Sequence, residues 1–163
     1  MSLFESDEYQ WRETYFIFFS ADKRPRADKL ERVLRSMNAR YLLRDLRTDE
    51  NRDFESVTVL SPDDYAAMDI TCTVGDEVTE QALEMATELK TTATKDQIDL
   101  VARIPKCSGR IEVYHFEQLV FVGSEADDEF DDFMDPGALL VVLQQIADLC
   151  DGIVVDPQSG SLL

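Results

Sequence analysis

The amino-acid sequence predicts an α+β fold, an antiparallel-rich mixed sheet with three to four helices on one side. The first observation is that short apolar or alternating runs, typical of strands, follow one another across short polar turns. The second is that few segments show the helical spacing of apolar residues that a doubly wound sheet would need. The third is composition, since 44% hydrophobic and 31% charged residues in a chain of 163 are typical of one globular domain.

The first part of the chain predicts one central strand, one helix and three further strands. Residues 14–20 (Thr-Tyr-Phe-Ile-Phe-Phe-Ser) are mostly aromatic or β-branched, which favours a buried central strand. Apolar residues at helical spacing predict a helix that starts after Asp22 and Pro25 and ends near Asn38. Alternating apolar and polar residues predict strands at 41–46, 54–60 and 68–74.

The second part predicts two helices, a seam and a further group of strands. Helical spacing continues through Leu89, and a second short helix precedes Pro105. The interval from Pro105 to Gly109 is the predicted seam between halves 1–104 and 110–163 of one domain, 1–163. Their shared order of elements suggests two ferredoxin-like units around one core. The remaining strands are predicted at 110–116, 119–122 and 152–155, with a short last strand after a turn at 156–160.

The clearest predicted helix covers residues 136–150. Asp135 is a suitable N-cap and Pro136 suits the first helical position. The helix body is polar only at Gln144, Gln145 and Asp148. An apolar surface this wide is either buried on two sides or pairs two subunits, so a structural homodimer is one of the expected functions.

Charge is distributed very unevenly along the chain, whose formal net charge is −18. Residues 111–163 contain no lysine or arginine, and they include an acidic run at 125–135. Residues 23–47 contain nine basic and three acidic residues. The acid excess argues against binding to nucleic acid or to an anionic membrane, because both require positive charge. Adaptation to high salt is an alternative explanation of the same composition.

The basic residues of the first helix have three interpretations. The favoured one is a solvated face of an amphipathic helix. The others are a site for an anion, a nucleic acid or an acidic partner, and a face that meets the acidic surface of a second copy of the chain. The residues of this basic face are Arg26, Lys29, Arg32 and Arg35.

Motifs for catalysis, cofactors and metals are missing from the sequence. It has no glycine-rich phosphate loop and no G-x-S-x-G elbow. The acidic run resembles the start of an EF-hand loop, but Asp132 replaces the required glycine and Ala138 the required glutamate. His115 is the only histidine, and its pairing with Cys107 as a nucleophile is a minor alternative to a structural role. We therefore predict no cofactor and no metal, and lean against an enzyme.

The three cysteines, widely spaced and odd in number, predict reduced thiols and a cytoplasmic protein. No stretch approaches the roughly 20 apolar residues of a membrane span. The N-terminal residues lack the apolar segment of a signal peptide.

The function expected from these features is a non-catalytic acidic interaction module that binds a basic protein partner. Phenylalanines in the acidic run would anchor the partner and carboxylates would steer it. The main alternative is a small-molecule sensor or enzyme with a pocket between the sheet and helix 136–150. The predicted partner-binding residues are Glu125, Asp127, Asp128, Glu129, Phe130, Asp131, Asp132 and Phe133.

Overall fold

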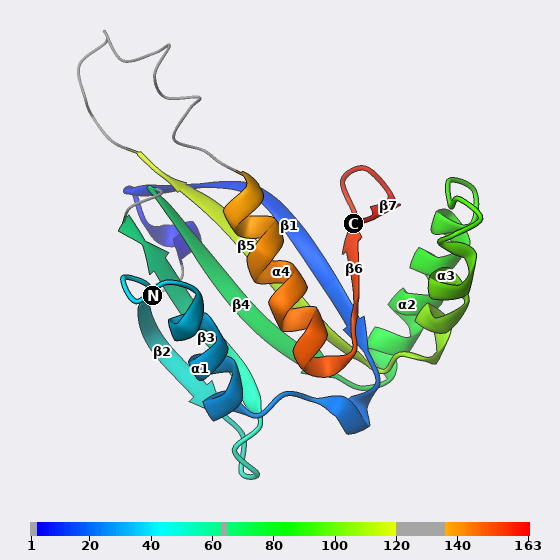
Figure 1. Cartoon of the computed structure of the whole chain (residues 1–163), viewed down its shortest axis with the longest axis horizontal. Coiled ribbons are helices and arrows are strands. Elements are labelled where there is room, and N and C mark those ends of the chain that lie inside the picture. Colours follow the sequence, from blue (N-terminus) through cyan, green and yellow to red (C-terminus); the bar gives the residue numbers. More distant parts are fainter. Residues whose placement is uncertain (1–2, 63–64, 120–135) are drawn as a thin grey trace, which may run out of the picture.

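A computed structural model describes residues 3–62, 65–119 and 136–163, with side chains from residue 139 in the last range. Its centre is one seven-stranded sheet in the order β2-β3-β4-β5-β1-β6-β7, and every neighbouring pair is antiparallel (Figure 1). The α+β prediction is confirmed. The strands are β1 (Tyr9–Phe19), β2 (Leu42–Thr48), β3 (Phe54–Ser61), β4 (Ala66–Val74), β5 (Gly109–Gln118), β6 (Ile153–Asp156) and β7 (Ser161–Leu162).

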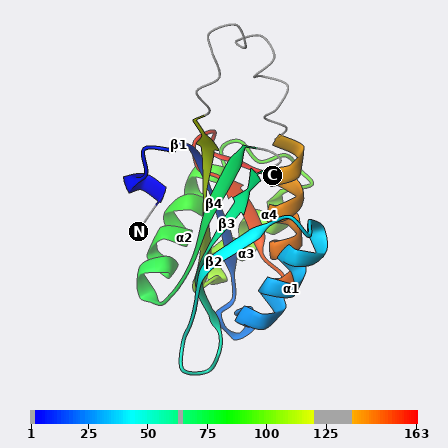
Figure 2. The ribbon, with the colours of Figure 1, turned by 90° about the vertical axis from the view of Figure 1, so that its left-hand side faces the viewer.

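Helices cover both faces of the sheet, which corrects the prediction that they lie on one side. Viewed along the sheet, α1 and α4 lie on one face, and α2 lies with the N-terminal turn η1 on the other (Figure 2). The helices are α1 (Ala27–Met37), α2 (Asp76–Leu89), α3 (Ile98–Arg103) and α4 (Pro136–Cys150). Short 3₁₀ turns within the described ranges include η1 (Leu3–Glu5), η2 (Ala21–Lys23) and η4 (Ile104–Lys106).

The reason for two covered faces lies in β1. Ile17, Phe18 and Phe19 are consecutive and all at most 1% exposed, although neighbouring residues of a strand point to opposite faces. Ile17 and Phe19 pack in the core under α1 and α4, whereas Phe18 packs under α2 and η4. A continuous apolar run in a central strand therefore requires helices on both sides.

The core under α1 and α4 is continuous. Leu30 and Leu34 of α1 and Val142 and Ile146 of α4 are fully buried against the sheet. The opposite face is divided. Its apolar residues form one cluster beneath α2, α3 and β6, and a smaller one around η1. Polar side chains of β2, β3 and β4 on this face belong to neither cluster, and this polar strip holds the candidate site.

Most predicted elements are found with small shifts of their ends. Asp22 lies in η2 and not at the start of α1, whose N-cap position is Arg26. β5 continues to Gln118, and the strand predicted at 119–122 lies mostly outside the described residues. Strands from both predicted halves alternate in the sheet, since β1 lies between β5 and β6. Within the described ranges, no helix has the length and apolarity to cross a membrane.

Candidate binding groove

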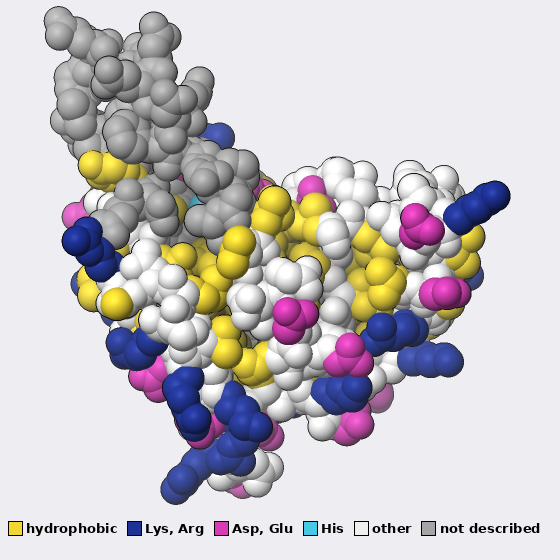
Figure 3. Space-filling model, viewed as in Figure 1, with side chains coloured by type: hydrophobic (Ala, Val, Ile, Leu, Met, Phe, Trp, Pro, Cys, Tyr) yellow, Lys and Arg dark blue, Asp and Glu magenta, His cyan; other side chains and the backbone are white. Residues whose placement is uncertain are grey.

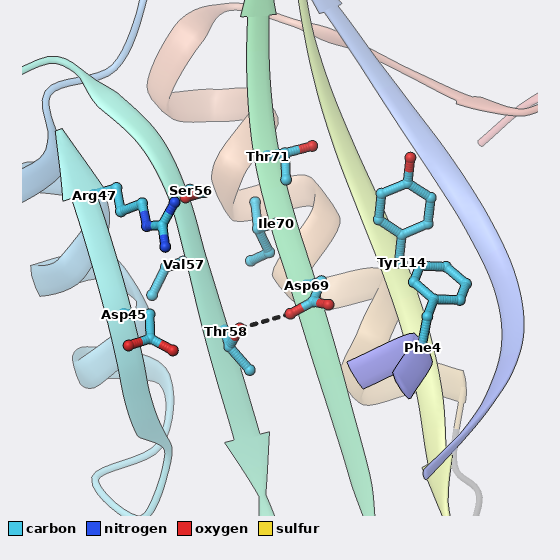
Figure 4. A pocket seen from close by; sticks show the side chains of 10 residues that line it. All are labelled: Phe4, Asp45, Arg47, Ser56, Val57, Thr58, Asp69, Ile70, Thr71 and Tyr114. Atoms are coloured by element: carbon cyan, nitrogen blue, oxygen red, sulfur yellow. Dashed lines mark hydrogen bonds between the residues drawn. The ribbon is translucent and has the colours of Figure 1, made fainter. Parts of the chain in front are cut away.

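A hollow of about 270 Å³ opens on the polar strip of the sheet. The side chains that line it come from η1 and from four neighbouring strands (Figure 4). We call this hollow the groove; its lining residues are Phe4, Asp45, Arg47, Ser56, Val57, Thr58, Asp69, Ile70, Thr71 and Tyr114.

Phe4 and Tyr114 form the aromatic side of the groove. Their rings meet edge to face with centroids 5.4 Å apart, and Phe4 also contacts Phe116 at 4.8 Å. The turn η1 holds Phe4 there because the preceding Leu3 is buried in the small cluster beneath it. Phe4 nevertheless stays 56% exposed.

Asp69 lies beside these rings at the centre of the groove. Its Oδ1 accepts a hydrogen bond of 2.6 Å from the Thr58 hydroxyl on the paired strand β3. Its Oδ2 accepts one of 3.4 Å from the Leu3 N–H, which ties η1 to the sheet. Each carboxylate oxygen has lone pairs left after these two bonds. Asp69 is therefore oriented by the fold and still able to accept hydrogen bonds from a ligand.

A charge-neutralised network lies beside the groove on β5. Glu112 accepts a hydrogen bond from the Tyr114 hydroxyl and pairs with the Arg110 guanidinium, which lies 5.4 Å from the centre of the Phe16 ring. Burial, and then the hydrogen bond to Glu112, raise the pKa of Tyr114 to about 12. Tyr114 therefore stays protonated at neutral pH, and Glu112 contributes little free charge to the groove.

The cross-strand row next to that of Thr58 and Asp69 carries hydrogen-bond donors. Arg47, Ser56 and Thr71 lie in one cross-strand row on β2, β3 and β4. Figure 4 shows the Arg47 guanidinium reaching toward Ser56. These three side chains form no hydrogen bond or ion pair within the described part of the chain. Asp45, with φ of 53°, adds an exposed carboxylate on the edge strand.

Helix α2 adds an acidic surface on the same side of the sheet as the groove (Figure 2). Four of its five exposed carboxylates repeat at four-residue intervals, and no basic residue lies in its last turn. None of them forms an ion pair with another described residue. We call this surface the acidic helix face; its residues are Asp76, Glu77, Glu80, Glu84 and Glu88.

The predicted partner-binding residues, Glu125 to Phe133, lie outside the described residues. The basic face of α1 is exposed, and local acids pair with most of it: Asp28 with Arg26 at 3.5 Å and with Arg32 at 3.3 Å, and Glu31 with Arg35 at 3.1 Å. Lys29 is exposed and lines a separate hollow with Lys23 and Asp148. Lysines and arginines gather along the lower edge of the molecule in Figure 3. This arrangement agrees with a solvated helix face.

His115 and Cys107 lie apart and do not form a nucleophile pair. His115 is on the α1–α4 face of β5, where its Nδ1 lies 3.2 Å from Glu13 Oε1. Cys107 is buried in the cluster on the α2 side, and its thiol contacts the Arg103 carbonyl at 3.6 Å. Burial lowers the pKa of His115, although the Glu13 charge opposes this. Burial raises the pKa of Cys107, so its thiol stays protonated at neutral pH.

The described residues contain no group of three or more metal-ligating side chains. Beside α4 there is a hollow of about 190 Å³, lined by Leu140, Leu143, Gln144, Val154 and Leu163. If the protein were a small-molecule sensor, the ligand would bind in this hollow.

Comparison of the chain with protein-family models, curated proteins and solved structures finds no match. Sequence reasoning missed the groove, although one signal was present. Ser56, Thr58, Asp69 and Thr71 occupy alternate positions of two adjacent predicted strands. Such alternation indicates a polar sheet face that no helix covers.

Proposed function

We propose that this chain is a non-catalytic interaction module that binds a positively charged partner protein through the groove and the acidic helix face. The observation that carries the proposal is the meeting of an exposed aromatic ring, Phe4, with an oriented carboxylate, Asp69, on an uncovered part of the sheet. An aromatic ring beside a carboxylate suits the guanidinium of arginine or the ammonium of lysine.

The acidic helix face also favours a positively charged partner. Acidic side chains stabilise the first turn of a helix, which accounts for Asp76 and Glu77. Glu88 lies in the last turn of α2, where the helix dipole disfavours negative charge. The spacing also places like charges one turn apart, which destabilises a helix. Helix stability therefore does not explain the acidic helix face, whereas attraction of a basic partner does.

The acidic run at 125–135 is a second proposed contact, as its composition suggests. Neutralising Asp127, Asp128, Asp131 and Asp132 together should then weaken binding beyond any loss caused by changes in the groove. The three free cysteines are compatible with a reducing compartment, and we propose a cytoplasmic location.

The proposal is tested by mapping a basic probe on the protein. Acetyl-hexaarginine amide is titrated into ¹⁵N-labelled protein without an N-terminal tag, because a tag would adjoin Phe4. We expect saturable shifts of the backbone amides of Phe4, Ser56 and Tyr114. Phe4→Ala should weaken binding several-fold, since an exposed cation–π contact contributes about 0.5–1 kcal/mol.

The matched control for the groove is Asp22→Asn, which removes one exposed carboxylate at η2, away from the groove. Asp45→Asn removes one exposed carboxylate within it. If both variants lose the same affinity, the probe senses only net charge, and the groove is not the contact surface.

A further inference from the structure

We infer that the groove recognises the C-terminal end of the partner chain, and that the last residue of that chain is lysine or arginine. The inference rests on the proposed function and specifies which part of a basic partner enters the groove. It comes from the row of donors Arg47, Ser56 and Thr71 next to Asp69, which a cationic side chain would leave unused.

The row is arranged for a carboxylate. Arg47 pairs in register with Ser56, and Ser56 pairs with Thr71, so the three side chains lie side by side on one face of the sheet. A guanidinium binds a carboxylate through two parallel hydrogen bonds, and hydroxyls supply further donors to the same group. All three side chains are without partners in the described part of the chain, so a ligand carboxylate displaces no internal hydrogen bond.

The row also lies at a suitable separation from the cation site. Thr71 and Asp69 are two residues apart on β4 and point to the same face. Two residues of a strand span roughly 7 Å. A ligand that uses both sites must carry a carboxylate and a cationic group about this far apart. A lysine or arginine at a chain terminus does so, because a stem of three or four carbons separates its cationic group from the backbone carboxylate.

Two other ligand chemistries fit the groove less well. A purely cationic segment would bring positive charge next to Arg47 without a partner for it. A purely anionic ligand would meet Asp45 and Asp69. Only a ligand with both charges satisfies the two sides of the groove together.

The test compares two probes that differ only in the terminal group, acetyl-Gly-Arg with a free carboxylate and acetyl-Gly-Arg amide. The amide has the higher positive charge, so the net charge of the protein favours the amide. We expect the reverse order, with the free acid binding about tenfold more tightly, as one charge-assisted contact contributes. Affinities are measured by chemical-shift titration of the full chain at low salt.

Variants separate the carboxylate site from the cation site. The Arg47→Gln variant should bind the acid and the amide about equally. It should bind the amide no more weakly than the wild-type chain does. Arg47→Lys, which keeps the charge but not the paired donors, should retain part of the preference. Arg44→Gln is the matched control, because Arg44 is an exposed arginine of the same strand that does not line the groove, and it should keep the full preference.

Equal binding of the two probes, with both weakened by a combined Asp45→Asn and Asp69→Asn change, overturns the inference and leaves the proposed function standing. Probe binding that is unaffected by the Asp45 and Asp69 changes overturns both. Free L-arginine that binds more tightly than the acetylated acid also overturns the inference, because the ligand would then be an amino acid and not a chain terminus.

Discussion

Glu80→Lys in helix α2 should stabilise the protein and weaken its binding to a basic partner. Glu80 is exposed, and Asp76 and Glu84 lie one helical turn before and after it. Like charges at this spacing cost a helix roughly 0.2–0.5 kcal/mol per pair, and opposite charges contribute a similar amount with the opposite sign. A lysine at position 80 turns two repulsive pairs into two attractive ones.

The expected gain in the free energy of unfolding is therefore about 1–2 kcal/mol at low salt. The pair from Asp76 to position 80 should contribute more, since an acid N-terminal to a lysine is the better orientation. Urea denaturation followed by circular dichroism measures this gain. In 0.5 M salt most of it should disappear, because the charges involved are exposed.

Glu50→Lys is the control, since it makes the same change of charge in an exposed turn outside the helix. If the free energy of unfolding rises equally in the two variants, the gain comes from the net charge of −18 and not from repulsion within the acidic helix face. If Glu80→Lys is neutral or destabilising at low salt, the carboxylates of α2 do not repel one another. Helix stability could then explain these carboxylates without a basic partner.

Two further predictions concern residues outside the groove. The pKa of His115 is lowered in the folded chain. The fold should therefore lose stability as the pH falls from about 6.5 through this lowered pKa, because the unfolded chain binds the proton more readily. Glu13→Gln should lower the pKa of His115 further in an NMR titration; an unchanged value would contradict the contact at 3.2 Å. Gly109→Ala should cost about 1–3 kcal/mol in urea denaturation, because its Cβ would lie 2.4 Å from the buried Phe19 ring; a neutral result would contradict that packing.

The strands and helices could be predicted from sequence where local patterns were strong. The spacing of Leu30 and Leu34 indicated α1, and the alternation of β3 and β4 indicated two paired strands. The position of the helices could not be predicted in the same way, because either face of an antiparallel sheet can be covered. The run from Ile17 to Phe19 did carry the information that both faces are buried.

The candidate groove could not be predicted as a unit. Phe4 and Tyr114 are 110 positions apart in the sequence, and the turn η1 that brings them together gave no strong local signal. In the sequence, Asp69 is one polar residue of an alternating strand. Only its hydrogen bonds with Thr58 and Leu3 show how its carboxylate is oriented. The charge asymmetry indicated how a partner would approach, but the contacts that define the groove come from the sheet register.

The proposed function requires that the carboxylates of the groove, the oriented Asp69 and the exposed Asp45, bind a cationic partner. The most direct measurement is the affinity of acetyl-hexaarginine amide for the wild-type chain and for the combined Asp45→Asn and Asp69→Asn variant, at 50 mM and 200 mM salt. We expect the wild-type affinity to fall with salt, and the variant to bind about tenfold or more weakly at 50 mM, as the loss of a charge-assisted contact implies. Equal affinities of the two proteins at both salt concentrations would contradict the claim.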